Sequence, residues 1–412
     1  MNAIYKIKQL INRKISKYIL SILFLMMLYG CVEPYEGVVQ DFDDVLVVNA
    51  IITNEFKRQE INLTRSYRFG DNGPAAEKNA TVLILDGEGG EFKFEETEPG
   101  KYLSESPFAA VTNKNYSLSI TTASGKSYGS NSMQLPVNTT SIDKLYAERI
   151  TNDDGIEGMA IFVDSYDPSG KSEYYRYDFE ETYKIIAPFW SPYDAVVVAE
   201  GYTTIDVRVI LREREERVCY GTDPSKSIDI HSTKELIEDR ISRYNVRFIE
   251  RDNYILSYRY SILVMQYVQT PEAFSYYETL QGLSKSSGNI FSEDQPGFLA
   301  GNVFAMSDSN ENVAGFFEVA AVAKKRIFFN YEDFFPGEEI PPFLKDCFLR
   351  TPSTNGSLGK RPLLNAIYDG NVRFYYYNIN RGPNEGPFLM VSSECGDCTT
   401  LGSNTAPGFW IE

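Results

Sequence analysis

The sequence contains a single histidine, His231, among its 412 residues. A metal site with several histidine ligands is therefore impossible within one chain, and a catalytic triad would have to use this one imidazole. His231 lies in an alternating Ile-Asp-Ile-His-Ser-Thr stretch that is typical of the end of a strand. A carboxylate pair is not excluded by the 57 acidic residues, but no pair stands out. We expect a protein without catalysis, cofactor or metal, with a carboxylate-based hydrolase as the less favoured alternative.

An excess of positive charge is also lacking. The chain has 40 Lys and Arg residues against 57 Asp and Glu residues, a formal net charge of -17. Proteins that bind nucleic acid need clustered basic side chains to displace the counterions of the phosphate backbone. We therefore expect no nucleic-acid partner.

Long apolar runs are missing as well. The longest near the N-terminus, residues 19–29, is shorter than the roughly 18 to 20 residues that cross a bilayer as a helix. The basic residues before it are Lys6, Lys8, Arg13, Lys14 and Lys17, with no acidic residue among them. This pattern is typical of a secretory signal. We expect residues 1–30 to be a signal peptide, whose removal moves the formal charge from -17 to -22.

The end of this leader resembles the lipobox of bacterial lipoproteins. Leu28 stands three residues before Cys31, and the small Gly30 stands just before it, although Tyr29 is bulkier than usual. In lipoproteins the cysteine becomes the acylated N-terminus, so Cys31 is the predicted lipidation site and the bilayer a predicted partner. An ordinary signal peptide with a chance cysteine is the alternative.

Residues 31–44 contain several acidic residues and no basic one, so we expect a solvated tether. Acidic residues soon after a lipidated cysteine resemble the signal that sends lipoproteins of the Bacteroidota to the outer face of the outer membrane. This resemblance implies an outer-membrane, lipid-anchored protein that faces the cell exterior.

Four cysteines follow Cys31, and an even number in an exported chain favours disulfides. They are Cys219, Cys347, Cys395 and Cys398. Three pairings are possible, and the sequence does not choose among them. The Cys-Gly-Asp-Cys spacing at the end of the chain is followed by two threonines, which indicates a loop rather than the helix of a redox motif. A zinc site and free or redox thiols are the alternatives.

Aromatic residues make up 14% of the chain and often occur in runs, which favours strands and a mostly β fold. In residues 45–137, short stretches alternate at period two and are separated by Asp-Gly, Gly-Gly and Pro-Gly turn signals. This spacing predicts an immunoglobulin-like or transthyretin-like β-sandwich.

Residues 138–412 are predicted to form a larger β-rich domain with one main helix. Strands are expected at 159–163, 174–186 and 203–211. Thr270 as N-cap and Pro271 at the first helical position predict the helix near 271–285. A proline-containing stretch at 188–194 interrupts the strands, and its aromatics Phe189 and Trp190 are candidate ligand or partner contacts.

Residues 258–330 carry a set of short motifs that is specific in combination. They are Thr-Pro-Glu-Ala-Phe at 270–274, Gly-Asn-Ile-Phe at 288–291, Gly-Asn at 301–302, Ala-Gly-Phe-Phe at 314–317 and Lys-Arg at 325–326, followed by Cys-Gly-Asp-Cys at 395–398 and Pro-Gly-Phe-Trp at 407–410. With them the chain resembles, over nearly its whole length, domain of unknown function 4249 (DUF4249), found in lipoproteins of the Bacteroidota. Gly301 and Gly315 are expected to allow close backbone packing.

The resemblance implies an accessory role in uptake, because similar lipoproteins tend to occur alongside TonB-dependent outer-membrane receptors, and it supplies no catalytic residues. We therefore expect an accessory or ligand-capturing subunit of a TonB-dependent transporter, with that receptor as partner. A structural subunit of another outer-membrane assembly is the alternative. The ligand cannot be derived, because tyrosine-rich surfaces suit sugars, peptides and proteins alike.

Overall fold

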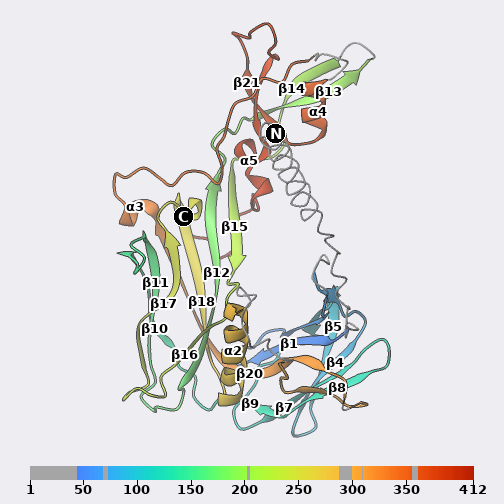
Figure 1. Cartoon of the computed structure of the whole chain (residues 1–412), viewed down its shortest axis with the longest axis vertical. Coiled ribbons are helices and arrows are strands. Elements are labelled where there is room, and N and C mark those ends of the chain that lie inside the picture. The colour runs from blue at the N-terminus through green and yellow to red at the C-terminus, as the bar shows by residue number, and fades with distance from the viewer. Residues whose placement is uncertain (1–43, 68–72, 202–204, 287–298, 309, 355–360) are drawn as a thin grey trace, which may run out of the picture. The chain divides into compact units, whose positions relative to one another are not determined.

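The computed structural model describes residues 44–67, 73–201, 205–286, 299–308, 310–354 and 361–412. Cys31, the predicted signal peptide and the predicted tether up to residue 43 lie outside the described residues. From Val45 onward, the described residues belong to one compact unit. Most of its elements are strands and only a few short helices accompany them, so the predicted mostly-β fold is confirmed (Figure 1).

The first part of the unit is an antiparallel array. Its strands are β1 (Leu46–Thr53), β2 (Glu60–Arg65), β3 (Ala75–Ala76), β4 (Thr81–Asp86), β5 (Glu91–Glu98), β6 (Lys101–Ser104), β7 (Asn115–Thr121), β8 (Ser127–Ser130) and β9 (Met133–Gln134). The main path runs in the order β1-β2-β6-β5-β4-β7-β8. In β4 the side chains of Val82 and Ile84 are fully buried while Thr81 is exposed, which is the period-two pattern of a half-buried strand.

The long strand β20 (Val313–Asn330) connects this array to the rest of the chain. Its first half pairs in parallel with β1, and its second half pairs antiparallel with β18 (Arg259–Val268). Strands from both sides of residue 137 therefore belong to one 15-stranded sheet. The predicted division at 137 stays a prediction; β9 ends shortly before it, and β10 (Ile142–Thr151) begins a different sheet.

Two glycines make the junction around β20 possible. A Cβ atom on Gly301 would lie 1.7 Å from the carbonyl oxygen of Gly315. Gly315 itself has φ 114°, and a Cβ there would lie 1.9 Å from the carbonyl oxygen of Val48. Asn302 exchanges two hydrogen bonds with the backbone of Phe317, at 2.7 and 2.9 Å. The close approach of these backbones excludes any side chain at the two glycines.

The central strand of the second part is β12 (Tyr174–Ile186), which has the predicted bounds. It pairs with β15 (Val218–Pro224), β16 (Asp229–Ser232) and β18 in the large sheet. Opposite it lies a three-stranded sheet of β10, β11 (Glu157–Tyr166) and β17 (Arg240–Glu250). The odd-numbered side chains of β12 face this three-stranded sheet, since Tyr177 stacks on Tyr244 of β17 with ring centroids 4.9 Å apart.

The even-numbered side chains of β12 lie on the opposite face, which helix α2 (Pro271–Ser286) covers in part (Figure 1). The predicted helix is therefore confirmed, and the Thr270 hydroxyl accepts a hydrogen bond from the Ala273 backbone N–H, as expected of its N-cap. From this side Arg176 of β12 packs against the ring of Tyr277 in α2, 4.6 Å from the ring centroid.

A small group of elements, here called the hairpin lobe, has its own core. It comprises β13 (Tyr193–Glu200), β14 (Ile205–Leu211), α4 (Pro362–Tyr368), β21 (Val372–Tyr377) and β22 (Phe388–Ser392), which lie together in Figure 1. The buried residues of its core are Ala195, Leu363, Val372, Phe374, Phe388 and Met390. The remaining elements are η1 (Tyr254–Leu256), β19 (Val303–Ala305), α3 (Tyr331–Phe334), α5 (Ser393–Gly396) and η3 (Cys398–Thr400).

The turn after β11 is organised by Asp167, whose carboxylate accepts hydrogen bonds from several donors that follow it. They include the Ser169 backbone N–H at 2.9 Å and the Ser172 hydroxyl at 2.7 Å. Burial alone would raise the pKa of Asp167, but the hydrogen bonds from Ser172, Ser169 and Lys171 outweigh it and lower the pKa to about 2. The stretch is thus a side-chain-stabilised turn.

We expect Asp167→Asn to lower the free energy of unfolding by about 1–3 kcal/mol at pH 7, because several donors lose a charged acceptor. The folded-state pKa lies below the unfolded value of about 3.9, so this contribution is fully present above about pH 4 and is lost as the pH falls toward 2. Urea unfolding at pH 7, 4 and 2 measures it. The difference between wild type and variant should shrink at pH 2; a difference that is equal at all three pH values would contradict the assignment.

Candidate functional site

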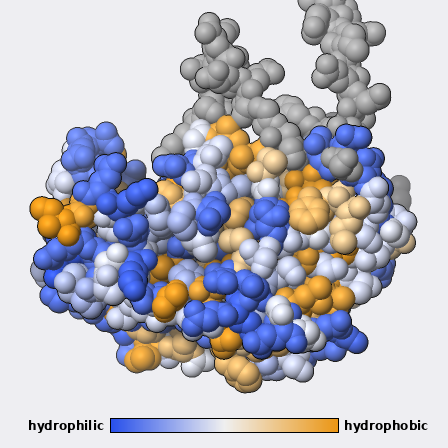
Figure 2. Space-filling view, turned by 90° about the horizontal axis from the view of Figure 1, so that it is seen from below, coloured by the Kyte–Doolittle hydropathy of each residue, from blue (hydrophilic) through white to orange (hydrophobic). Residues whose placement is uncertain are grey.

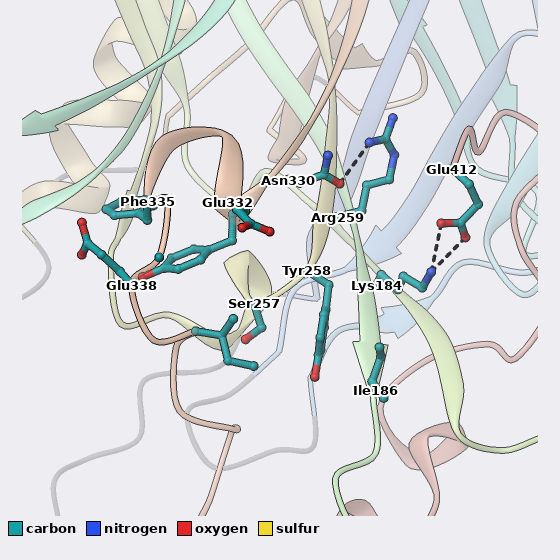
Figure 3. Close-up of a pocket in the computed structure, with 13 residues that line it drawn as sticks. Lys184, Ile186, Ser257, Tyr258, Arg259, Asn330, Glu332, Phe335, Glu338 and Glu412 are labelled. Carbon is teal, nitrogen blue, oxygen red and sulfur yellow. Dashed lines mark hydrogen bonds and ion pairs between the residues drawn. The ribbon is translucent and has the colours of Figure 1, made fainter.

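A cavity of about 470 Å³ opens at the end of β12 and the start of β18. We call it the tail groove, because the last residue of the sequence, Glu412, forms part of its wall. Figure 3 shows Lys184 and Glu412 on one side, Phe335 and Glu338 on the other, and Tyr258 between them. The remaining lining residues are Ile186, Ser257, Arg259, Asn330, Tyr331, Glu332, Gly337 and Ile340.

The cationic side of the tail groove is neutralised by the end of the chain. Lys184 Nζ lies 2.9 Å from Glu412 Oε2, and the Tyr220 hydroxyl donates to Glu412 Oε1 at 3.3 Å. The hydrogen bond from Lys184 is the main cause that lowers the pKa of Glu412. Arg259 donates to the Ile411 carbonyl oxygen and, at 3.1 Å, to Asn330 Oδ1.

Residues 407–412, which carry the Pro-Gly-Phe-Trp motif, lie across the face of the large sheet. The Arg326 guanidinium lies over the Phe409 ring at 3.6 Å. Trp410 makes edge contacts with Tyr220 of β15 and Phe328 of β20, with centroids 4.9 and 5.8 Å apart. The motif therefore packs against strands from both sides of β12, and its placement gives the tail groove one of its walls.

The acidic side of the groove is also paired. Glu338 forms ion pairs with Arg149 at 2.7 Å and with Arg251 at 2.6 Å, and the Arg149 guanidinium lies 4.3 Å from the ring centroid of the buried Phe335. Glu332 is exposed at the rim. Paired charges and aromatic walls suit the binding of a polar molecule, whereas the groove lining has no histidine or cysteine that could act as a nucleophile–base pair.

Metal binding finds no support in the described ranges. Within them, no group of three or more His, Cys, Asp or Glu side chains is placed to hold a metal ion. His231 lies in β16 with its ring 4.7 Å from that of Tyr244, and burial lowers its pKa. Its predicted place in a strand is confirmed, and its neutral ring serves packing.

The predicted disulfides are confirmed, and the structure supplies their pairing. Cys219 of β15 is bonded to Cys398, and Cys347 is bonded to Cys395. The two nearby cysteines thus bond separate distant partners, so the Cys-Gly-Asp-Cys spacing is neither a redox pair nor half of a zinc site. Between them the buried Asp397 carboxylate is held by Arg373 at 3.1 Å and caps η3 through the Thr399 N–H at 2.9 Å.

Phe189 and Trp190 do not line the tail groove. Both are half-buried: Phe189 makes an edge contact with Tyr375 of β21 at 5.2 Å, and its backbone N–H donates to the Cys395 carbonyl oxygen at 2.9 Å. Trp190 packs against the main core. They connect β12 to the disulfide-bonded segment, and a role in ligand or partner contact stays a prediction.

The charged run at 212–217 is not exposed throughout. It is a connection between β14 and β15 in which the Arg212 side chain is only 5% exposed and pairs with Glu216 at 2.5 Å.

The outer surface is mixed in hydropathy. Figure 2, which views the molecule from below, shows hydrophobic residues in separate groups among hydrophilic ones. In the part of the chain that the structure describes, no helix has both the length and the apolar character required to cross a bilayer.

Comparison with known proteins gives one family match. The family described as "Domain of unknown function (DUF4249)" matches residues 32–326. None of the curated proteins matches this sequence. Among solved structures, the crystal structure of a DUF4785 family protein from Legionella pneumophila subsp. pneumophila str. Philadelphia 1 is similar at 8% sequence identity and a TM-score of 0.17, over 53% of this chain and 51% of that chain. The chain thus spans about half the length of that protein, and this similarity is too low to inform the fold.

Proposed function

The chain belongs to the DUF4249 family, and on this basis we propose that it is a lipid-anchored, surface-exposed outer-membrane protein that serves as a non-catalytic, ligand-capturing subunit of a TonB-dependent transporter. The two disulfides are the main support, because bonds that tie residues 395–398 to β15 and to the connection between α3 and α4 are typical of an oxidising compartment outside the cytosol. The lipobox-like residues ending at Cys31 would provide the anchor.

The tail groove supports binding rather than chemistry. Its charged side chains Lys184, Arg259 and Glu338 are engaged with partners inside the protein, and Glu332 lies exposed at the rim. Aromatic and apolar groups line the space between them. The family resemblance is the only reason to propose a TonB-dependent receptor as the partner. A structural subunit of another outer-membrane assembly is the second candidate function.

The full-length, natively expressed lipoprotein, extracted gently in detergent and analysed by mass spectrometry of its partners, tests the proposal. We expect one TonB-dependent receptor in stoichiometric amount, and none when Cys31→Ala removes the acylation site. Recovery with envelope-assembly components would favour the structural alternative. Recovery without any partner would contradict both.

A further inference from the structure

A second cleft, about 390 Å³ in volume, opens between the large sheet and the three-stranded sheet. We propose that it binds a neutral, polyhydroxylated ligand, that is, a sugar. Its walls are formed by Phe179 and Glu181 of β12, Asp223 at the end of β15 and Arg247 of β17, with Lys226 at the rim. We call it the Asp223 cleft.

The floor of the Asp223 cleft is a charge pair that is already satisfied. Arg247 donates from Nε and Nη2 to the two oxygens of Glu181, each at 3.0 Å, and the Tyr260 hydroxyl adds a bond of 2.7 Å to Oε2. Glu181 is only 6% exposed. A bidentate pair of this kind is rigid and nearly neutral, so it provides fixed polar groups without attracting an ion.

Asp223 is the acceptor that this arrangement leaves available. In the register of β12 and β15 it stands directly opposite Glu181. Because Arg247 neutralises Glu181, the opposition of the two carboxylates is tolerated, and Asp223 keeps its own charge beside the pair. The Tyr183 hydroxyl donates to Asp223 Oδ2 at 2.8 Å, and the Tyr254 hydroxyl lies 3.2 Å from that of Tyr183. Tyr183 thus fixes the carboxylate of Asp223 through a hydrogen bond to Oδ2, while Asp223 itself lines the open cleft.

Phe179 supplies an apolar surface beside these groups. Its half-buried ring lines the cleft, with the Arg247 guanidinium 5.6 Å from its centroid. Lys226 and Ser227 are exposed at the opening and can donate hydrogen bonds. An aromatic face next to a fixed acceptor and two donors matches a sugar ring, which has an apolar C–H face and hydroxyl groups that both donate and accept.

Other ligand classes fit the Asp223 cleft less well. An anion would meet the Asp223 carboxylate, and the Arg247 charge is already compensated by Glu181. Within the described chain the cleft lacks the group of three acidic, histidine or cysteine ligands that a metal ion would need. A purely apolar ligand would desolvate Asp223 and Lys226 without replacing their hydrogen bonds.

The experiment uses the full-length lipoprotein in a detergent without a sugar headgroup, since a maltoside would itself be a ligand of this class. Saturation-transfer NMR is recorded with maltose, cellobiose, xylobiose and mannobiose, each at about 10 mM, so that millimolar affinities are detected. We expect saturation to be transferred from the protein to the ring protons of at least one disaccharide. No transfer to any of the four would overturn the proposal.

Two variants locate the binding. Asp223→Asn keeps an acceptor for Tyr183 but removes the charge, and Phe179→Ala removes the apolar surface; each should weaken the bound disaccharide roughly tenfold or more. Asp154→Asn makes the same chemical change as Asp223→Asn at an exposed turn between β10 and β11, and should bind as the wild type does. Equal melting temperatures of Asp223→Asn and wild type exclude unfolding. Unchanged affinity in Asp223→Asn would overturn the proposal.

This inference rests on the ligand-capturing part of the proposed function, and the two can fail separately. Loss of sugar binding in Asp223→Asn with unchanged recovery of the receptor would support the cleft and leave the complex intact. Sugar binding without any receptor partner would support the cleft and contradict the transporter role.

Discussion

Replacing Glu318 of β20 by alanine will lower the free energy of unfolding by about 3–5 kcal/mol, because the buried Arg176 then keeps only the more exposed Asp178 as an ion-pair partner. Glu318 is fully buried, and its Oε2 lies 3.4 Å from Arg176 Nη2. Burial alone would lower the pKa of Arg176, but Glu318, together with Tyr277, Asp178 and Tyr267, outweighs burial and raises the pKa, so the guanidinium stays charged. Tyr267 and Tyr277 enclose it at 4.5 and 4.6 Å, which leaves little room for water.

Urea denaturation followed by tryptophan fluorescence measures this loss. Glu95→Ala is the matched control, because its ion pair with Arg58 is exposed and should contribute less than about 1 kcal/mol. The double variant Arg176→Met with Glu318→Leu should recover most of the stability, since two apolar side chains of similar volume do not require charge compensation. A loss below about 1 kcal/mol for Glu318→Ala would show that water reaches Arg176.

Removing the disulfide between Cys219 and Cys398 with a double alanine variant will lower the free energy of unfolding by about 5 kcal/mol in the chain-entropy treatment. The bonded residues are 179 positions apart, and both are fully buried. The bond therefore restricts a long loop of the unfolded chain and holds η3, just before the tail, against β15.

The second disulfide provides an internal control. Cys347 and Cys395 are 48 positions apart, so the same treatment gives a loss about 1 kcal/mol smaller for their double variant. Urea midpoints of both variants under non-reducing conditions, with a thiol assay that confirms the remaining disulfide, provide the comparison. A larger loss for the Cys347 and Cys395 pair would mean that native packing around that disulfide, rather than loop length, sets the contribution.

Local features of the fold could be predicted with accuracy. The bounds of β12 follow from its aromatic and β-branched residues between turn signals, and α2 begins where Thr270 and Pro271 place it. Both depend on interactions within a few residues, namely side-chain alternation and capping. The burial of Arg212, in contrast, does not follow from local sequence, because it depends on Glu216 and on Asp194 from a different strand, 3.7 Å away.

The candidate sites could not be predicted, because each combines residues from distant segments. The tail groove joins Lys184 to Glu412, and the Asp223 cleft joins β12, β15 and β17. The Pro-Gly-Phe-Trp motif at 407–410 was part of the family resemblance, but it did not predict that these residues pack on the large sheet. The direct opposition of Glu181 and Asp223 is a matter of strand register, which alternation within each strand does not set.

By itself, the sequence determined that this protein is mostly β, that it has one main helix near 271–285, that its four later cysteines favour disulfides and that it carries the DUF4249 motifs. These properties depend on composition, local periodicity and short motifs. The tertiary structure alone decided which cysteines pair, that β20 joins β1 to β18 in one sheet, and that Asp223 faces an open cleft. Long-range pairing is selected by the simultaneous burial of many side chains, so no single stretch of the sequence contains it.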